Sequence, residues 1–200
     1  MRGASLLPFS LGLAAAEAKP PPFVEKAATA RWLVHNAEYA FQSTISVALG
    51  GMPFGNVQSM SDGTVGASDN STGVPYFYVS PLDTSMIDVA ANPAVSLTIT
   101  EEQINATCST KKYDPEDPRC ARVTLSGSMV EVTDADETEQ AQAALFSRHP
   151  AMAGWPGDHS FAFWKVDIKN IWLIDYFGGA ANISTADYFK SKPLLPTHHQ

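Results

Sequence analysis

Histidine is the residue type in this chain best suited to acid–base or metal chemistry, but the histidines do not form a catalytic pattern. None of the five belongs to an HExxH helix or to a Cys–His cluster that binds zinc. We interpret His35 as a surface or capping residue of a helix. His149 has no identifiable nucleophile beside it. His198 and His199 lie near the C-terminus, where two ligands on a mobile segment would bind a metal weakly.

Other motifs for enzymatic chemistry are also missing. The sequence contains no GxSxG elbow, no Walker loop and no GxGxxG fingerprint. Gly50-Gly51 and Gly178-Gly179 are typical of turns. Acidic pairs such as Glu101-Glu102 are common on solvated surfaces. We therefore predict no catalytic, cofactor-binding or metal-binding residue.

The first 18 residues have the three parts of a secretory signal peptide. Arg2 supplies a positive charge, Leu6–Ala16 is an apolar run too short to span a bilayer, and Ala16-Glu17-Ala18 is a cleavage site. A frayed apolar N-terminus or an anchor is the alternative. We predict cleavage after Ala18, a proline-rich linker over residues 19–23, and a secreted mature chain without membrane insertion.

The two cysteines gain a meaning from this predicted export. Cys108 and Cys120 enclose the segment CSTKKYDPEDPRC. An even number of cysteines in an oxidising compartment predicts one disulfide, which would contribute roughly 3 kcal/mol by constraining a short loop. Two free buried thiols are the alternative, and a zinc site would need further ligands.

Three N-x-S/T sequons also fit an exported chain, and each lies beside turn-like residues. Their acceptors are Asn70, Asn105 and Asn182. We predict that at least two of them carry glycan.

Charge narrows the possible partners. The formal net charge is −8, so nucleic acid and anionic membranes are poor partners for the whole surface. Residues 32–110 contain no lysine or arginine, whereas they contain seven acidic residues. A phosphate bound along this stretch would depend on backbone N–H groups and helix N-termini alone.

Hydrophobic periodicity and turn residues predict a chain built mainly from strands. The predicted strands are Thr44–Leu49, Asn56–Asp62, Val74–Ser80, Val95–Thr100, Ala121–Thr133 with a bend at Gly127, and one or two strands within Phe161–Gly179. The predicted helices are Glu25–Gln42, Thr84–Ala91, one that begins at Asp134 with Glu137 in a capping box, and one that begins at Ser184 with Asp187 as its partner.

These elements predict a mainly β fold with flanking helices, in one domain over residues 24–190. A closed sheet would leave no exposed strand edges. Residues 191–200 are predicted to be a disordered tail.

Several longer motifs carry a family resemblance that covers nearly all of the mature chain. They are AEYA, SMSDG, GVPYFYVSPLD, NPAVSLTIT, LFSRHPAM and NIWLIDYFGG. With the signal peptide, they resemble the CREG glycoproteins, a family named for repression of adenovirus-stimulated genes. The resemblance implies the split β-barrel of flavin mononucleotide-binding proteins such as pyridoxamine phosphate oxidase. It also implies a homodimer that is not known as an enzyme.

The resemblance breaks down at the cofactor phosphate. In the flavin-binding relatives, strand–break–helix segments carry lysine or arginine for that phosphate. The matching segment here, Ser80–Asp88, offers the hydroxyls of Ser80, Thr84 and Ser85 but no cation. We therefore expect no flavin-binding residue and no cofactor.

The resemblance also implies a function. CREG proteins are described as secreted glycoproteins that influence growth and differentiation and are linked to the endolysosomal route through the mannose 6-phosphate receptor. Our leading hypothesis is a non-enzymatic, secreted or endolysosomal, homodimeric glycoprotein that binds such a receptor or another partner. We expect a second subunit to cover the strand NIWLIDYF, because it has apolar residues on both faces.

Two alternatives remain open. The first is a flavin- or tetrapyrrole-linked oxidoreductase on the same barrel, which is an analogy of fold alone. The second is a module that binds a small apolar ligand in the barrel or the dimer crevice, lined by Trp155, Trp164, Trp172 and Phe163. Core packing is the simpler explanation of these aromatic residues.

Overall fold

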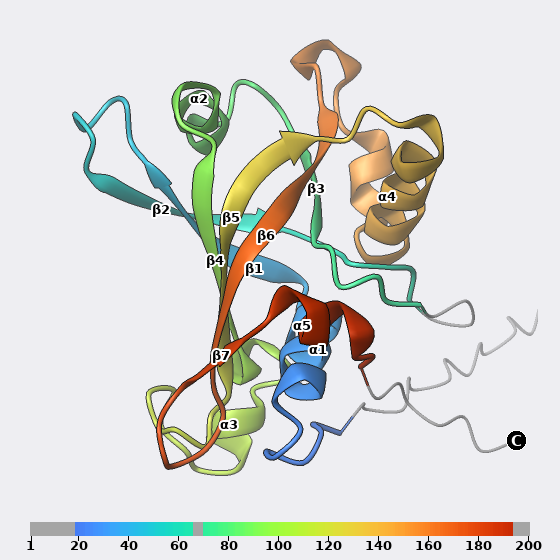
Figure 1. Cartoon of the computed structure of the whole chain (residues 1–200). Helices are drawn as coiled ribbons and strands as arrows, with labels where there is room; N and C mark the ends of the chain where they lie inside the picture. The colour runs from blue at the N-terminus through green and yellow to red at the C-terminus, as the bar shows by residue number, and fades with distance from the viewer. Residues whose placement is uncertain (1–18, 66–69, 194–200) are drawn as a thin grey trace, which may run out of the picture.

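Strands and short helices follow one another along residues 19–65 and 70–193, which this computed structural model describes (Figure 1). The strands are β1 (Tyr39–Ile45), β2 (Pro53–Ser59), β3 (Tyr76–Val79), β4 (Ala94–Thr100), β5 (Arg122–Glu131), β6 (Ala162–Ile174) and β7 (Ala181–Ile183). The helices are α1 (Lys26–Asn36), α2 (Thr84–Ala91), α3 (Thr107–Thr110), α4 (Ala135–Arg148) and α5 (Thr185–Lys190), and short 3-10 turns are η2 (Glu101–Gln103), η3 (Pro150–Gly154) and η4 (Gly157–His159).

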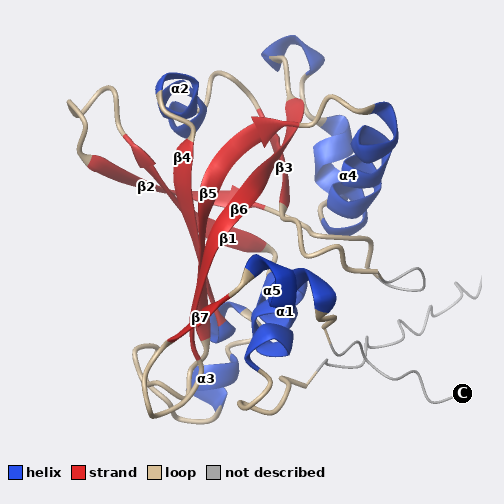
Figure 2. Ribbon diagram, in the orientation of Figure 1, coloured by secondary structure: helices blue, strands red, loops and turns tan. Residues whose placement is uncertain are grey.

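All seven strands belong to one antiparallel sheet. Its order is β2-β1-β4-β5-β6-β3, and β7 also pairs with β6. The end strands β2 and β3 approach each other where an isolated bridge joins Ser61 to Tyr76. The sheet is therefore a partly closed barrel with flanking helices, which confirms the predicted split-barrel fold (Figure 2).

The buried side of the sheet packs on helices. Leu97, Leu125 and Ile171, from β4, β5 and β6, are fully buried in one core cluster with Leu33 of α1 and Tyr188 of α5. Figure 2 shows α1 and α5 together on this side of the sheet. Apolar burial of this kind supplies most of the driving force for folding.

Three helices begin where the sequence predicts, because a side chain caps each one. Asp83 accepts a hydrogen bond from the N–H of Ser85 (2.7 Å), Asp134 accepts one from Glu137 (2.9 Å), and Ser184 accepts one from Asp187 (3.0 Å). Each cap satisfies a backbone donor that the first turn leaves unpaired.

The first helix is shorter than predicted. It ends at Asn36 rather than near Gln42, and residues 39–45 instead form β1 between β2 and β4. The helix-like spacing of Ala40 and Phe41 was misleading, because pairing with two neighbouring strands outweighs a local periodic pattern. Ala40 is buried, whereas Phe41 is exposed on the opposite face of the strand.

The end of the sheet follows the prediction in outline. The pairing of β5 with β6 shifts register between Ser126 and Gly127, which confirms the predicted bend. A Cβ at Gly127 would lie 2.1 Å from the backbone oxygen of Asp167, so only glycine fits there. Within Phe161–Gly179, for which one or two strands were expected, the structure has one long strand, β6.

The structure contains the disulfide between Cys108 and Cys120, and neither cysteine is free. Within the loop that it closes, Arg119 forms a two-point ion pair with Asp117 (2.9 and 2.6 Å). The Arg119 guanidinium also lies 4.1 Å from the centre of the Tyr113 ring. These contacts give the loop a defined conformation.

Candidate functional site

The gap between the end strands holds the candidate site. β2 and β3 diverge from the Ser61–Tyr76 bridge, and a cavity of about 430 Å³ opens between them. Residues 57–59 of β2 and residues 78–80 of β3 form two of its sides, and Asp83 lies at the start of α2. The segment that leads into β6 completes the lining with Met152, Trp155, Pro156 and Phe161.

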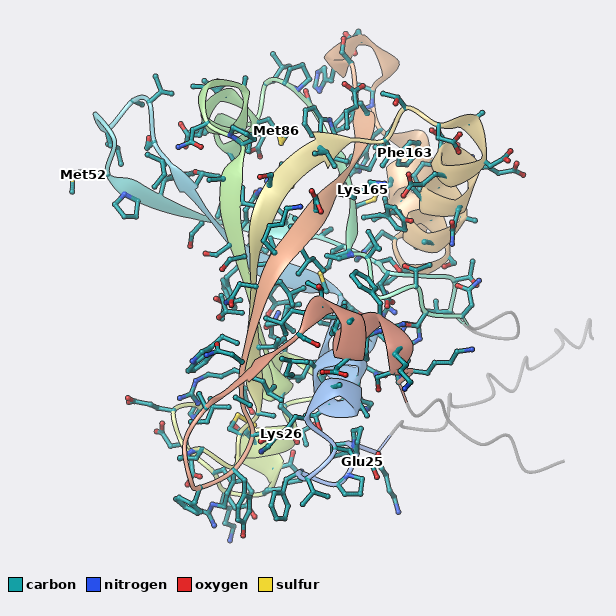
Figure 3. All side chains as sticks on the ribbon, in the orientation of Figure 1. Glu25, Lys26, Met52, Met86, Phe163 and Lys165 are labelled. Carbon is teal, nitrogen blue, oxygen red and sulfur yellow. A yellow bond between two sulfur atoms is a disulfide. The ribbon has the colours of Figure 1, made fainter. Side chains whose placement is uncertain are left out.

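Aromatic rings form one wall of this cavity. The ring of Tyr78 stacks on those of Phe161 and Phe163, with centroid separations of 5.0 and 4.8 Å. The Trp155 ring lies nearly parallel to that of Tyr78, with centroids 6.0 Å apart. Phe146 of α4 packs edge-on against Tyr78, and Figure 3 shows Phe163 close to that helix. Such a wall suits a flat apolar molecule.

Two of the three hydroxyls expected to face a phosphate, those of Ser80 and Ser85, are engaged elsewhere. Ser80 donates from its Oγ to the carbonyl oxygen of His159 (2.6 Å) and accepts from the N–H of Leu82 (3.1 Å). Ser85 is fully buried and accepts from the Nδ2 of Asn56 (3.0 Å). Ser80 therefore holds the 152–161 segment over the cavity, while Ser85 fixes α2 to β2.

The charges around the cavity oppose a flavin phosphate. No lysine or arginine is among the described residues that line it, and Asp83 adds a negative charge. A phosphate would meet neither a cation nor a free hydroxyl from Ser80 or Ser85. These residues do not fit flavin mononucleotide.

A family model described as "CREG, beta-barrel" matches residues 21–190. The chain belongs to the CREG family. It is 41% identical to Protein CREG1 of Gallus gallus over 175 residues, covering 86% of this chain and 90% of the chicken protein. It is 42% identical to human Protein CREG2 over 180 residues, covering 89% of this chain and 60% of the human protein.

Solved structures show the same fold at low sequence identity. A heme binding protein from Mycobacterium smegmatis has a TM-score of 0.63 at 16% identity, over 84% of this chain and 61% of that protein. The protein Atu2129 from Agrobacterium tumefaciens has a TM-score of 0.59 at 18% identity, over 84% of this chain and 60% of that one. At these identities the likeness concerns the fold alone.

A second surface of this CREG family member is the outer face of the sheet, opposite the core. We define it by one row of directly paired residues, Val57, Phe41, Thr98, Thr124, Trp172 and Asn182. The hydroxyls of Thr98 and Thr124 lie 3.2 Å apart. Phe41 is 45% exposed and Val57 is 52% exposed, although both are large and apolar. In Figure 1, α1, α4 and α5 lie on the other side of the sheet.

The hairpin between β1 and β2 extends the outer face. We call residues 45–57 the arm, because it projects from the body of the protein in Figure 1. Val47, Leu49 and Met52 are all exposed there, and Figure 3 shows Met52 at its far end. Leu82 and Ile87, beside and within α2, are exposed as well.

A buried polar network lies on the helix side of the barrel. Arg31 of α1 donates to the backbone oxygens of Ser71 (2.9 Å) and Ser191 (2.7 Å). Asp62 accepts from the N–H of Gly73 (3.0 Å) and lies 2.6 Å from Nδ1 of His35. The prediction that His35 is a surface or capping residue is therefore wrong, because this histidine is buried against a carboxylate.

Two buried tyrosines flank this network. Burial raises the pKa of the Tyr188 phenol well above its ordinary value, with nearby Asp62 as a further cause. Burial and the neighbouring carboxylate of Glu137 raise the pKa of Tyr76 in the same direction. Both phenols stay neutral at physiological pH and act as hydrogen-bonding and packing groups.

The three sequon asparagines are all exposed. Asn70 accepts a hydrogen bond from the N–H of Thr64 (3.0 Å), Asn105 lies in a left-handed turn (φ 54°), and Asn182 lies on β7. Their glycosylation stays a prediction. The signal peptide and its cleavage site at Ala18 lie outside the described residues.

Metal ligands, membrane-spanning helices and the other histidines complete the description of the predicted site residues. Within residues 19–65 and 70–193 no three His, Cys, Asp or Glu side chains are arranged to hold a metal ion. No helix of that part of the chain has the length and apolarity to cross a bilayer. The Nε2 atom of His149 lies 3.1 Å from the backbone oxygen of Met60. His198 and His199 lie outside the described residues.

Only part of the proposed apolar ligand site comes together. Trp155 lines the cavity, and Phe163 supports its wall through Tyr78. Trp164 packs on the core, and Trp172 belongs to the outer face. Tyr78, the centre of the aromatic cluster, is not among the residues predicted for this site, although PYFYV is visibly an aromatic strand.

Proposed function

We propose that this CREG family member is a non-enzymatic, secreted or endolysosomal, homodimeric glycoprotein that modulates cell growth and differentiation by binding a receptor or partner. The observation that carries the proposal is a group of exposed apolar side chains on the outer face and its arm, namely Phe41, Val57, Val47, Leu49 and Met52. Monomeric soluble proteins rarely expose a large contiguous apolar surface unless it binds something.

A second copy of the chain is the partner that we propose for the outer face. Most homo-oligomers are two-fold dimers, in which the same patch of both subunits meets. In NIWLIDYF, Ile171 and Leu173 belong to the core, whereas Trp172 belongs to the outer face. This division supports the expectation that a partner subunit covers the exposed side of the strand.

Receptor binding through glycans is supported by the exposed positions of Asn70, Asn105 and Asn182. The disulfide supports an oxidising compartment. The lack of phosphate-binding cations in the lining of the cavity supports a role other than flavin-dependent catalysis. A glycan-dependent receptor such as the mannose 6-phosphate receptor fits this combination.

Light scattering on the secreted glycoprotein at micromolar concentration tests the dimer. We expect twice the polypeptide mass plus glycan, and the same oligomeric state after glycosidase treatment. A monomer that carries no glycan would refute the proposal on both points.

Receptor binding needs a separate measurement. The secreted protein should bind immobilised mannose 6-phosphate receptor, and free mannose 6-phosphate should displace it. Glycosidase-treated protein is the matched control. Binding that survives this treatment would show a receptor contact that does not depend on glycan.

A further inference from the structure

The cavity between β2 and β3 has the size of a small-molecule site without the charge of a phosphate site. A volume of about 430 Å³ lies within the range of ligand pockets. We propose that it binds a planar, uncharged aromatic molecule that has no phosphate group. This proposal is independent of the dimer and of the glycans.

Aromatic rings of the lining offer a stacking surface. The ring planes of Trp155 and Phe161 lie 19° and 27° from that of Tyr78, and they are tilted by 43° to each other. Trp155 lines the cavity and is 39% exposed. A flat ligand would cover this surface and gain stacking contacts with it.

One polar atom in the cavity lining has no hydrogen-bond partner. Gln58 lines the cavity and is only 8% exposed, yet the Nε2 of its side-chain amide is buried without a hydrogen-bond partner among the described residues. Buried polar groups in proteins nearly always have a hydrogen-bond partner. A polar edge on the ligand, such as a ring nitrogen or a carbonyl group, would supply the partner that the chain does not.

The charge of the cavity lining selects against an anionic ligand. Asp83 is the charged residue among the described residues that line the cavity, and the hydroxyl of Ser80 already donates to His159. An anionic group in the cavity would therefore lose hydration and meet a like charge. A neutral ring avoids both costs, so charge selects against phosphorylated ligands.

The backbone adds polar groups. β2 and β3 are the end strands of the sheet order, and the isolated bridge at Ser61 and Tyr76 joins them below the cavity. Edge strands present unpaired N–H and C=O groups toward the gap beside them. These groups can hydrogen-bond the edge of a heterocycle that lies between the strands.

Riboflavin and flavin mononucleotide form a suitable probe pair, because they share one ring system and differ in a phosphate. Flavin fluorescence is titrated with the purified glycoprotein. We expect riboflavin to bind at least about tenfold more tightly than flavin mononucleotide, because the phosphate would be desolvated near Asp83. Equal or tighter binding of flavin mononucleotide would overturn the proposal.

Variants locate the binding. Trp155→Ala and Gln58→Leu should each weaken riboflavin binding by about tenfold or more, through lost stacking and a lost hydrogen bond. Gln42→Leu is the matched control, because the Gln42 amide is also buried and unpaired among the described residues but does not line the cavity.

The remaining outcomes decide against the proposal. Unchanged riboflavin affinity in Trp155→Ala would place the binding elsewhere. Lumichrome is the flavin ring system alone. If the wild-type protein quenches the fluorescence of neither riboflavin nor lumichrome, the cavity does not bind this class of molecule. Circular dichroism of each variant separates loss of binding from loss of fold.

Discussion

Trp172 on β6 and Asn182 on β7 lie directly opposite each other in an antiparallel pair. Directly paired residues of an antiparallel sheet project from the same face. A glycan on Asn182 would therefore leave the outer face at its β7 edge. Thr98 and Thr124 lie further along the same row of pairs. The row thus has a predicted glycan at one end and exposed apolar side chains at the other.

A glycan in the middle of the outer face should prevent the proposed dimer. Thr98→Asn creates a new sequon with Ile99 and Thr100, and residue 98 lies between Phe41 and Thr124 in the row. We expect a secreted monomer, because the bulky glycan blocks close approach of a second face. Light scattering measures the mass, and glycosidase treatment shows that the new site is used.

Two controls accompany this variant. Thr98→Gln changes the same side chain without adding a sequon and should remain dimeric. Asn182→Gln removes a glycan from the edge of the face and should also remain dimeric. If the glycosylated Thr98→Asn protein is a dimer, the two subunits meet elsewhere.

A charge on the outer face should have a similar effect without a glycan. Phe41→Glu places a carboxylate on a residue that is 45% exposed. Burying that charge in an interface without a partner should weaken dimerisation by about a hundredfold or more. Sedimentation over a concentration series measures the dissociation constant.

Phe189→Glu is the matched control for this substitution. Phe189 of α5 is also 45% exposed, but it lies on the helix side of the sheet rather than in the outer row. We expect it to leave the dissociation constant unchanged. Equal weakening by both variants would mean that charge alone, rather than the outer face, controls association.

Local features made much of the fold predictable. Asp83, Asp134 and Ser184 cap their helices through hydrogen bonds within three residues, so the sequence places these helix starts well. Alternation of apolar residues likewise locates β4 and β5. The disulfide between the two cysteines was predictable because the N-terminal signal peptide indicates export to an oxidising compartment.

The remaining features depend on contacts between distant residues. His35 and Asp62 are 27 positions apart, and nothing in either local sequence indicates a buried pair. The cavity depends on the hydrogen bond between Ser80 and His159, which are 79 positions apart. The start of β1 lies within a helix-like pattern. It was not predictable for the same reason, because β1 is fixed by pairing with β2 and β4, which follow later in the chain.

Titration of the disulfide loop should show a strongly acidic carboxyl group. Hydrogen bonds from Arg119 lower the pKa of Asp117 to about 2. Because this pKa is depressed in the folded protein, the ion pair is intact above the ordinary range of aspartate. It is lost as the pH falls through about 2.

Carboxyl NMR chemical shifts measure this midpoint directly. In Arg119→Gln, the pKa of Asp117 should rise toward the ordinary aspartate value of about 3.9. Asp117→Asn should abolish the transition and so confirm its assignment. A midpoint in the wild-type protein near the ordinary value would show that the pair does not persist in solution.

A single methyl group added at Gly73 should lower stability for two separate reasons. Its φ is +82°, and a Cβ there would lie 2.7 Å from the guanidinium carbon of Arg31. That guanidinium is held by Ser71 and Ser191 and lies 5.3 Å from the Tyr188 ring, so it has little freedom to move. Backbone strain and overpacking together should make Gly73→Ala less stable by about 2–4 kcal/mol.

Urea unfolding of deglycosylated protein measures this loss of stability and keeps glycan effects apart from it. Gly154→Ala is the control, because a Cβ at Gly154 would meet no atom within 4 Å. We expect that variant to differ from the wild type by no more than about 0.5 kcal/mol. If Gly73→Ala were equally harmless, Arg31 would have to move freely, and the buried network around Asp62 would not fix the loop before β3.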